Sequence, residues 1–187
     1  MQQLLIIVAY TSLAGFALPI GGALASVERL TPYWLEQEFR HGVLALGGGI
    51  LLAAVALVLV PHGMRELTAV PAISSLIAGG LLFSAIDLML TKSGRPASNL
   101  IAALLDFIPE AIALGALIST QASLGVLLAI FIGLQNLPEG FNAYRELVAN
   151  AHATKKRAMF LLTGSALLGP LCGLVGFWVL SDAPVAT

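Results

Sequence analysis

The sequence predicts an all-α protein, a polytopic bundle of transmembrane helices, from three observations. Of the 187 residues, 58% are hydrophobic and only 10% are charged, and the mean hydropathy is +0.95. A soluble domain of this length carries about a quarter charged residues. The charges are also separated by apolar stretches long enough to cross a bilayer, which takes roughly 20 residues. The chain is therefore expected to be an integral membrane protein with lipid as its solvent.

Six spans are defined by the gaps between charged residues. In chain order they cover about 4–25, 42–61, 70–90, 99–118, 124–144 and 158–180. The first is aliphatic and lacks the basic start of a signal peptide. The second ends before the polar string 62–66, and the third contains one acid, Asp87. The fourth and fifth carry acids near mid-membrane and are joined by the polar turn 119–123. The sixth follows a run of basic residues, and the six are expected to form a single transmembrane domain, 1–187.

The basic residues predict the orientation of these spans. Eight of the nine Lys and Arg residues fall on one side of the predicted bundle, and Arg65 falls on the other. Basic loops stay in the cytoplasm, so we expect both termini to be extracytoplasmic. The expected location is a bacterial cytoplasmic membrane. The lone Cys172 allows no internal disulfide. A net charge of -1 without a basic cluster argues against nucleic acid as a partner.

Three acids lie at mid-membrane, where each costs about 2.5–3.5 kcal/mol on insertion scales. Asp106 and Glu110 are four residues apart and share one face of the fourth span. Gln135 and Glu139 repeat this spacing on the fifth span. A proline directly precedes each glutamate and removes a backbone hydrogen bond from its helix. Because a short turn makes the two spans antiparallel neighbours, the two faces are expected to meet.

Joined in this way, the three carboxylates and the carboxamides of Gln135 and Asn136 would form an oxygen-rich cage. Carboxylates so close together repel one another, and a bound divalent cation would neutralise them. A metal or proton site is therefore the favoured interpretation. The structural alternative is that the two carboxamides join helices by hydrogen bonds, and that the acids are hydrogen-bonded to a neighbouring helix.

The fifth-span string QNLPEG (135–140), which follows an equivalent Pro-Glu motif at 109–110, resembles the ZIP (Zrt/Irt-like) divalent-metal transporters. The second span is similar to that family's second helix, with His62 and Glu66 at its outer end. These two residues are otherwise expected to lie in an ordinary solvated loop. The resemblance covers essentially the whole chain, and the paired motif is its specific part.

The resemblance also assigns metal ligands. Asp106 takes the place of a histidine, while Glu110, Gln135 and Glu139 match the usual ligands of the first metal site. Asn136 stands where a ligand of a second metal is expected. The sixth span lacks the acid that commonly precedes its Pro-Leu run, so the resemblance implies one metal ion. The family fold has eight spans, and this chain is expected to have a ZIP-like fold that lacks helices 7 and 8.

The function implied by the resemblance is inward transport of a divalent metal cation by alternating access around the mid-membrane site. Zinc, iron or manganese would be the substrate, with no organic cofactor and no enzymatic activity. A site without histidine is harder than usual and favours oxygen-preferring ions such as Mn²⁺ and Fe²⁺ alongside Zn²⁺. Expected partners are the lipid bilayer and divalent metal ions, with a homodimer as one option.

Two other functions stay open at this point. A metal-binding membrane protein that does not transport, or a partner subunit, would keep the site after losing the final helices. An intramembrane hydrolase would use the carboxylates as acid and base on a bound water. This last reading lacks a second metal, a core histidine and an obvious nucleophile.

Overall fold

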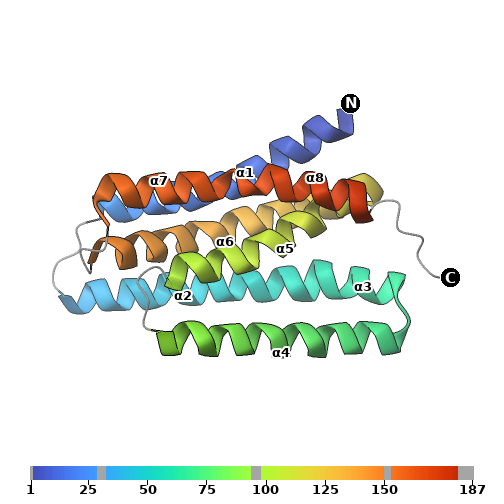
Figure 1. Ribbon diagram of the computed structural model, residues 1–187, viewed down its shortest axis with the longest axis horizontal. Coiled ribbons are helices and arrows are strands. Elements are labelled where there is room, and N and C mark those ends of the chain that lie inside the picture. The colour runs from blue at the N-terminus through green and yellow to red at the C-terminus, as the bar shows by residue number, and fades with distance from the viewer. Residues whose placement is uncertain (1, 29–32, 94–97, 150–152, 181–187) are drawn as a thin grey trace.

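The computed structural model describes residues 2–28, 33–93, 98–149 and 153–180, and these residues are helical almost throughout (Figure 1). The elements are α1 (Gln2–Val27), α2 (Tyr33–Ala54), the π-helical turn η1 (Val55–Leu59), α3 (Val60–Glu66), α4 (Ala69–Ser93), α5 (Ser98–Thr120), α6 (Ala122–Ala149), α7 (Lys155–Ala166) and α8 (Leu168–Leu180). Six helical segments are long and apolar enough to cross a membrane. The expected all-α fold with six spans is confirmed, and the chain is an integral membrane protein.

The observed second span is longer than the predicted one. α2 begins at Tyr33, and the helix continues through η1 into α3, which ends at Glu66. The expectation that His62 and Glu66 lie in a loop is therefore wrong, because both are helical. Pro61 does not interrupt the helix, and it stands directly after the π-helical turn η1, as the second residue of α3.

The sixth span is divided into α7 and α8 by a break at Leu167. Pro170 lies in the first turn of α8, where its missing N–H does least harm to the helix. α7 begins with a side-chain cap, because the Thr154 hydroxyl accepts a hydrogen bond from the backbone N–H of Arg157 at 3.3 Å.

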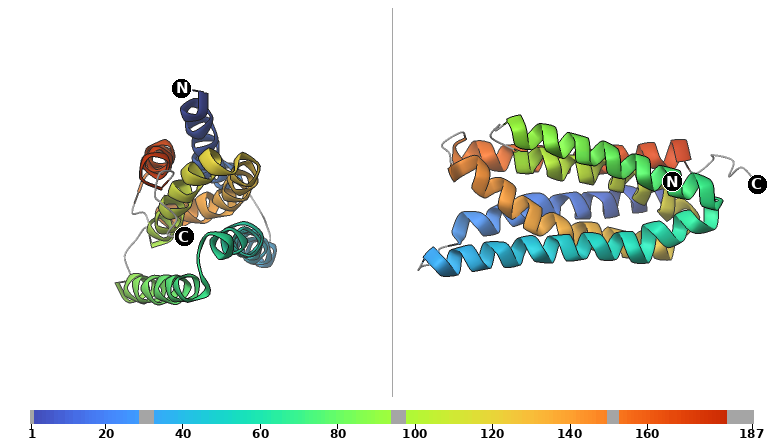
Figure 2. Two further views of the ribbon diagram at one scale, coloured as in Figure 1. Left: turned by 90° about the vertical axis from the view of Figure 1, so that its right-hand side faces the viewer. Right: turned by 90° about the horizontal axis from the view of Figure 1, so that it is seen from below.

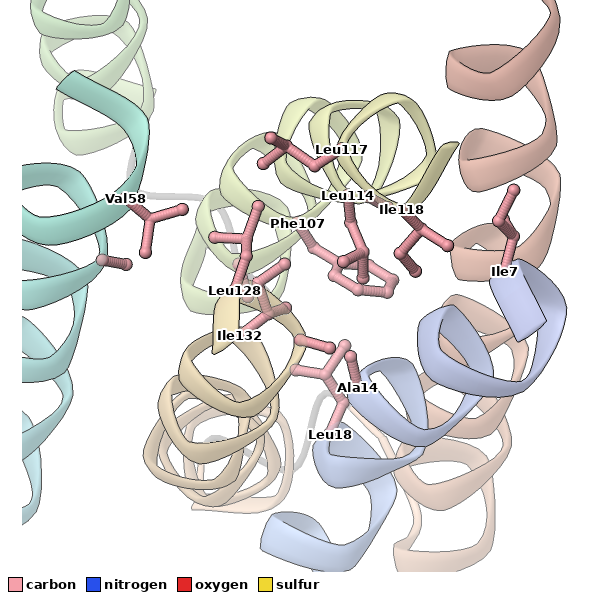
Figure 3. Close-up of a cluster of buried hydrophobic side chains, with 14 residues drawn as sticks. Ile7, Ala14, Leu18, Val58, Phe107, Leu114, Leu117, Ile118, Leu128 and Ile132 are labelled. Carbon is pink, nitrogen blue, oxygen red and sulfur yellow. The ribbon is translucent and has the colours of Figure 1, made fainter. Parts of the chain in front are cut away.

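Four spans form a closely packed unit, named here the core bundle: α1, α5, α6 and the pair α7–α8. α1 packs mainly on α6, and α5 packs on both α8 and α6. The centre of this bundle is a cluster of buried aliphatic side chains around Phe107, drawn from α1, α5 and α6 with Val58 of η1 at its edge (Figure 3). Burial of this cluster holds α1, α5 and α6 together, and Cys172 and Phe177 of α8 pack against it.

Glycines allow the helices of the core bundle to touch backbone to backbone. A methyl group added to Gly115 of α5 would lie 1.9 Å from the carbonyl oxygen of Gly173. One added to Gly176 of α8 would lie 1.9 Å from the carbonyl oxygen of Ile112. Small residues of this kind are what permit close helix packing inside a bilayer, where no hydrophobic effect drives helices together.

The remaining two spans lie outside the core bundle. The long helix α2–η1–α3 packs along α6, and within the described residues α4 makes its few contacts mainly with α3 and α5. Figure 2 shows α4 at the periphery of the bundle in the end-on view. None of the described side chains of α4 is buried, so its apolar residues are exposed around most of the helix.

Candidate metal centre

The candidate centre lies where α5 and α6 run side by side (Figure 1). Both helices continue through their internal prolines, Pro109 and Pro138. Each proline lacks a backbone N–H, so the carbonyl one turn earlier, at Leu105 and at Leu134, loses its helical partner beside the acids. On the α2 side, the ring of Pro138 packs where Gly47 leaves room, with 3.0 Å between its Cγ and a methyl group added to that glycine.

Glu110 and Gln135 form the central contact of the site. The Nε2 of Gln135 donates to both carboxylate oxygens of Glu110, at 3.2 and 3.3 Å. Glu110 is 7% exposed and Gln135 is 1% exposed, so this contact is shielded from the surroundings. The predicted meeting of the acidic face of α5 with the amide of α6 is thus seen directly.

Glu139 and Asp106 lie beside this contact and are each only half-buried. The carboxyl of Glu139 interacts electrostatically with those of Asp106 and Glu110. Among the described residues, two buried oxygens have no hydrogen-bond partner here: Oε1 of Gln135 and Oε2 of Glu139. The site therefore contains like charges in proximity and acceptor oxygens that nothing satisfies.

Asn136 is used differently from the other four predicted residues. Its Nδ2 donates to the carbonyl oxygen of Ala14 on α1 at 2.8 Å, and the side chain is fully buried. The geometry is that of a hydrogen bond joining α6 to α1, which is the structural alternative raised by the sequence. Its Oδ1 lacks a partner within the described part of the chain.

The cage expected from the sequence is not fully assembled. The part of the chain that the structure describes holds no group of three or more His, Cys, Asp and Glu side chains close enough to bind a metal ion together. Both oxygens of Glu110 instead accept from the amide of Gln135.

Two further polar residues of α6, Asn142 and Glu146, share the face that carries Gln135 and Glu139, because residues spaced by three and four lie on one side of a helix. Glu146 accepts from the Ser98 hydroxyl at 2.5 Å and from the Asn99 backbone N–H at 2.8 Å. Sequence reasoning missed both residues, although their spacing from Glu139 continues the same stripe.

Each end of the bundle carries its own polar contacts. At the end where α6 finishes, Arg145 forms a salt bridge with Glu28 and lies over the ring of Phe141. That ring makes an edge contact with Phe39 of α2. At the opposite end, the Nε2 of Gln121 lies 3.3 Å from Nδ1 of His62. The side chains of Asp87 and Glu66 are outside the described part.

The fold and these contacts define an α-helical polytopic membrane protein with a buried polar cluster between two proline-containing helices. The sequence matches no protein-family model and no curated protein. A functional assignment consequently rests on the residues themselves.

Proposed function

We propose that this protein is a divalent-cation transporter whose central site lies between α5 and α6. The substrate would be Zn²⁺, Fe²⁺ or Mn²⁺. The residues proposed to bind it are Asp106, Glu110, Gln135 and Glu139. Asn136 contributes by fixing α6 to α1, through its hydrogen bond to Ala14.

The observation that carries this proposal is the pair of buried, unpartnered oxygens on α6, Oε1 of Gln135 and Oε2 of Glu139. Each unsatisfied polar group in the hydrocarbon region costs several kcal/mol. A cation coordinated by oxygen would satisfy both atoms together. It would also remove the repulsion between Glu139 and Glu110, whose carboxyls interact electrostatically.

Binding requires one local change. The Gln135 amide now donates to Glu110 through Nε2. Turning this amide over would withdraw its N–H groups and present Oε1 to the space beside Glu110. Of the three proposed carboxylate ligands, Glu110 and Glu139 already balance the charge of one divalent ion, Asp106 adds a further carboxylate, and the amide adds a neutral oxygen ligand. A site composed of oxygens suits Mn²⁺ and Fe²⁺ better than a site containing thiolate or imidazole would.

Two further features support transport by alternating access. The motif 135–140 resembles that of the ZIP transporters, in which a paired Pro-Glu motif supplies the metal ligands. The arrangement of helices also offers two parts of unequal packing, the core bundle with its glycine contacts and the loosely attached helices α2 to α4. Relative movement of two such parts around a mid-membrane site is the usual basis of alternating access.

Equilibrium binding of radioactive Mn²⁺ and Zn²⁺ to the detergent-purified protein tests the site. We expect Glu110→Gln and Glu139→Gln each to weaken binding at least tenfold, because each removes a charged ligand. The control is Glu38→Gln, which neutralises an exposed acid on α2. A wild-type protein that binds neither ion, or variants that bind as well as wild type, would overturn the proposal.

Uptake into proteoliposomes then separates transport from binding alone. Wild-type protein should accumulate the ion that it binds, and Glu139→Gln should not. Binding without any uptake would exclude a transporter and favour the other candidate, a metal-binding membrane protein or partner subunit.

A further inference from the structure

The contacts between α5 and α6 follow one continuous antiparallel register. Glu110 meets Gln135 near mid-membrane, and Asn99 meets Glu146 at the end of the bundle. Moving from the first contact to the second takes eleven residues backwards along α5 and eleven forwards along α6. Eleven residues are about three helical turns, so both helices advance together and the register between the two contacts is fixed.

This register carries polar residues of α6 over the whole distance, and polar residues of α5 face them at Asp106 and Asn99. Asp106 stands opposite Glu139, in agreement with their electrostatic interaction, and Ala103 stands opposite Asn142. We name this strip the polar seam and define it by Asn99, Ala103, Asp106, Glu139, Asn142 and Glu146. It leads from the central site to the basic end, meaning the end of the bundle that carries Arg145 and the run 155–157.

The interface between the same two helices is apolar on the other side of the central site. Leu114 and Leu117 of α5 pack there with Leu128 and Ile132 of α6, all within the buried aliphatic cluster (Figure 3). A charged group entering this half would lose its hydration without gaining ligands. The α5/α6 interface therefore offers polar side chains only on the side of the central site that leads to the basic end.

Asn142 is an unusual member of the seam. Its side chain is 9% exposed, and among the described residues it has no side-chain hydrogen bond. The residue opposite it, Ala103, is buried and presents only a methyl group. Its amide atoms are not among the fully buried polar atoms that lack a partner in the described residues, so the carboxamide is not sealed off, and it stands between Glu139 and Glu146, one turn from each.

We propose that the polar seam is the route by which a divalent cation passes between the central site and the basic end, with Asn142 and Glu146 as successive ligands. This inference rests on the proposed function. Ligands on successive turns are about 5–6 Å apart, so the ion keeps a protein oxygen within reach as it leaves Glu139. Glu146 closes the route here, because its carboxylate is held by Ser98 and Asn99. Passage requires it to release them.

Cysteine accessibility tests the route without relying on transport. In a Cys172→Ser background, Asn142→Cys is compared with Leu128→Cys, which lies in the apolar half. A membrane-impermeant methanethiosulfonate reagent is applied to each side of sealed vesicles in turn, and exposed Lys155→Cys reports which side is the basic end. We expect Asn142→Cys to react from the basic end at least tenfold faster than Leu128→Cys, and Mn²⁺ to slow the reaction.

Equal rates for the two cysteines, or reaction of Asn142→Cys from the opposite end alone, would overturn the route. Glu146→Gln gives an independent test, because glutamine still accepts a hydrogen bond from Ser98 or Asn99 and preserves the fold. In Glu146→Gln, the fold decrease in Mn²⁺ flux should be at least ten times the fold decrease in Mn²⁺ affinity. A flux unchanged from wild type would overturn the role of Glu146. If the wild-type protein does not bind Mn²⁺ at all, the proposed central site is wrong, and this result is distinct from a failure of the route.

Discussion

Gly21 of α1 and Gly140 of α6 lie against each other's helix backbone. A methyl group on Gly21 would lie 2.0 Å from the carbonyl oxygen of Leu137, and one on Gly140 would lie 2.0 Å from the carbonyl oxygen of Leu18. The contact is reciprocal, and such approaches allow weak Cα–H···O bonds between helices. Since Gly140 directly follows Glu139, this contact also fixes the depth and rotation of the central site relative to α1.

Gly140→Ala should therefore destabilise the protein by about 1–3 kcal/mol, the usual cost of forcing extra volume into a packed interior. Thermal unfolding in detergent, followed by circular dichroism, measures the change. The control is Gly79→Ala on α4, where an added methyl group meets nothing within 4 Å. Alanine is the better helix former by about 1 kcal/mol, so this variant should be no less stable than wild type. A loss of stability equal in both variants would contradict the close contact.

Gln135→Met keeps the size of the side chain and removes both hydrogen bonds to Glu110. The buried carboxylate is then left without donors, at a cost of about 1–3 kcal/mol. Adding Glu110→Met should restore part of this loss, because both polar partners are then gone. A double-mutant cycle on unfolding free energies measures the coupling. Strictly additive effects would mean that the two side chains do not interact.

Asn136→Ala separates the two roles considered for this residue. Loss of its bond to the Ala14 carbonyl should destabilise the protein by about 1–3 kcal/mol. The effect on Mn²⁺ affinity should be smaller than that of Glu139→Gln, because Asn136 faces α1 rather than α5. Unfolding and equilibrium binding are measured on the same preparation. A stable variant that no longer binds Mn²⁺ would make Asn136 a ligand instead.

The salt bridge between Arg145 and Glu28 joins α6 to α1 at the basic end, with side chains 21% and 12% exposed. Breaking it with Glu28→Gln should cost about 1–2 kcal/mol, more than an exposed pair, because Arg145 stays partly buried. The exchanged pair Glu28→Arg with Arg145→Glu should recover part of the loss. Unfolding at low and high salt checks this, and an exchanged pair less stable than the single variant would contradict a direct interaction.

The sequence was sufficient to predict the spans and the pairing of α5 with α6. Long apolar stretches leave few alternatives in lipid, since a helix satisfies its own backbone hydrogen bonds. The spacing of Glu110 and Gln135 then places both on facing sides of antiparallel helices. The resulting contact between them needs no information beyond periodicity and a short connecting turn.

The neighbour that a given side chain contacts depends on packing and could not be predicted from the sequence. Asn136 neighbours Gln135 in the chain but lies about 100° around the helix, so it reaches α1 instead of the acids. The π-helical turn η1 has no composition that separates it from ordinary helix, because Val55–Leu59 is purely aliphatic. The peripheral position of α4 could not be predicted from the sequence either, because helix surfaces that face lipid and those that face protein are both apolar.

The π-helical turn η1 determines how the second span would respond to the deletion of one residue. A π-helical turn accommodates about one residue more than the α-helix around it. Deleting one residue from Val55–Leu59 would let α2 run into α3 as an unbroken α-helix, and the later residues would keep their facing relative to α2, because the turn already absorbs the extra residue. His62 would then stay beside Gln121. A deletion within the regular α-helix of α2 would instead rotate all later residues by about 100°, so η1 is the one stretch of this span whose length can change by a residue without turning its two halves against each other.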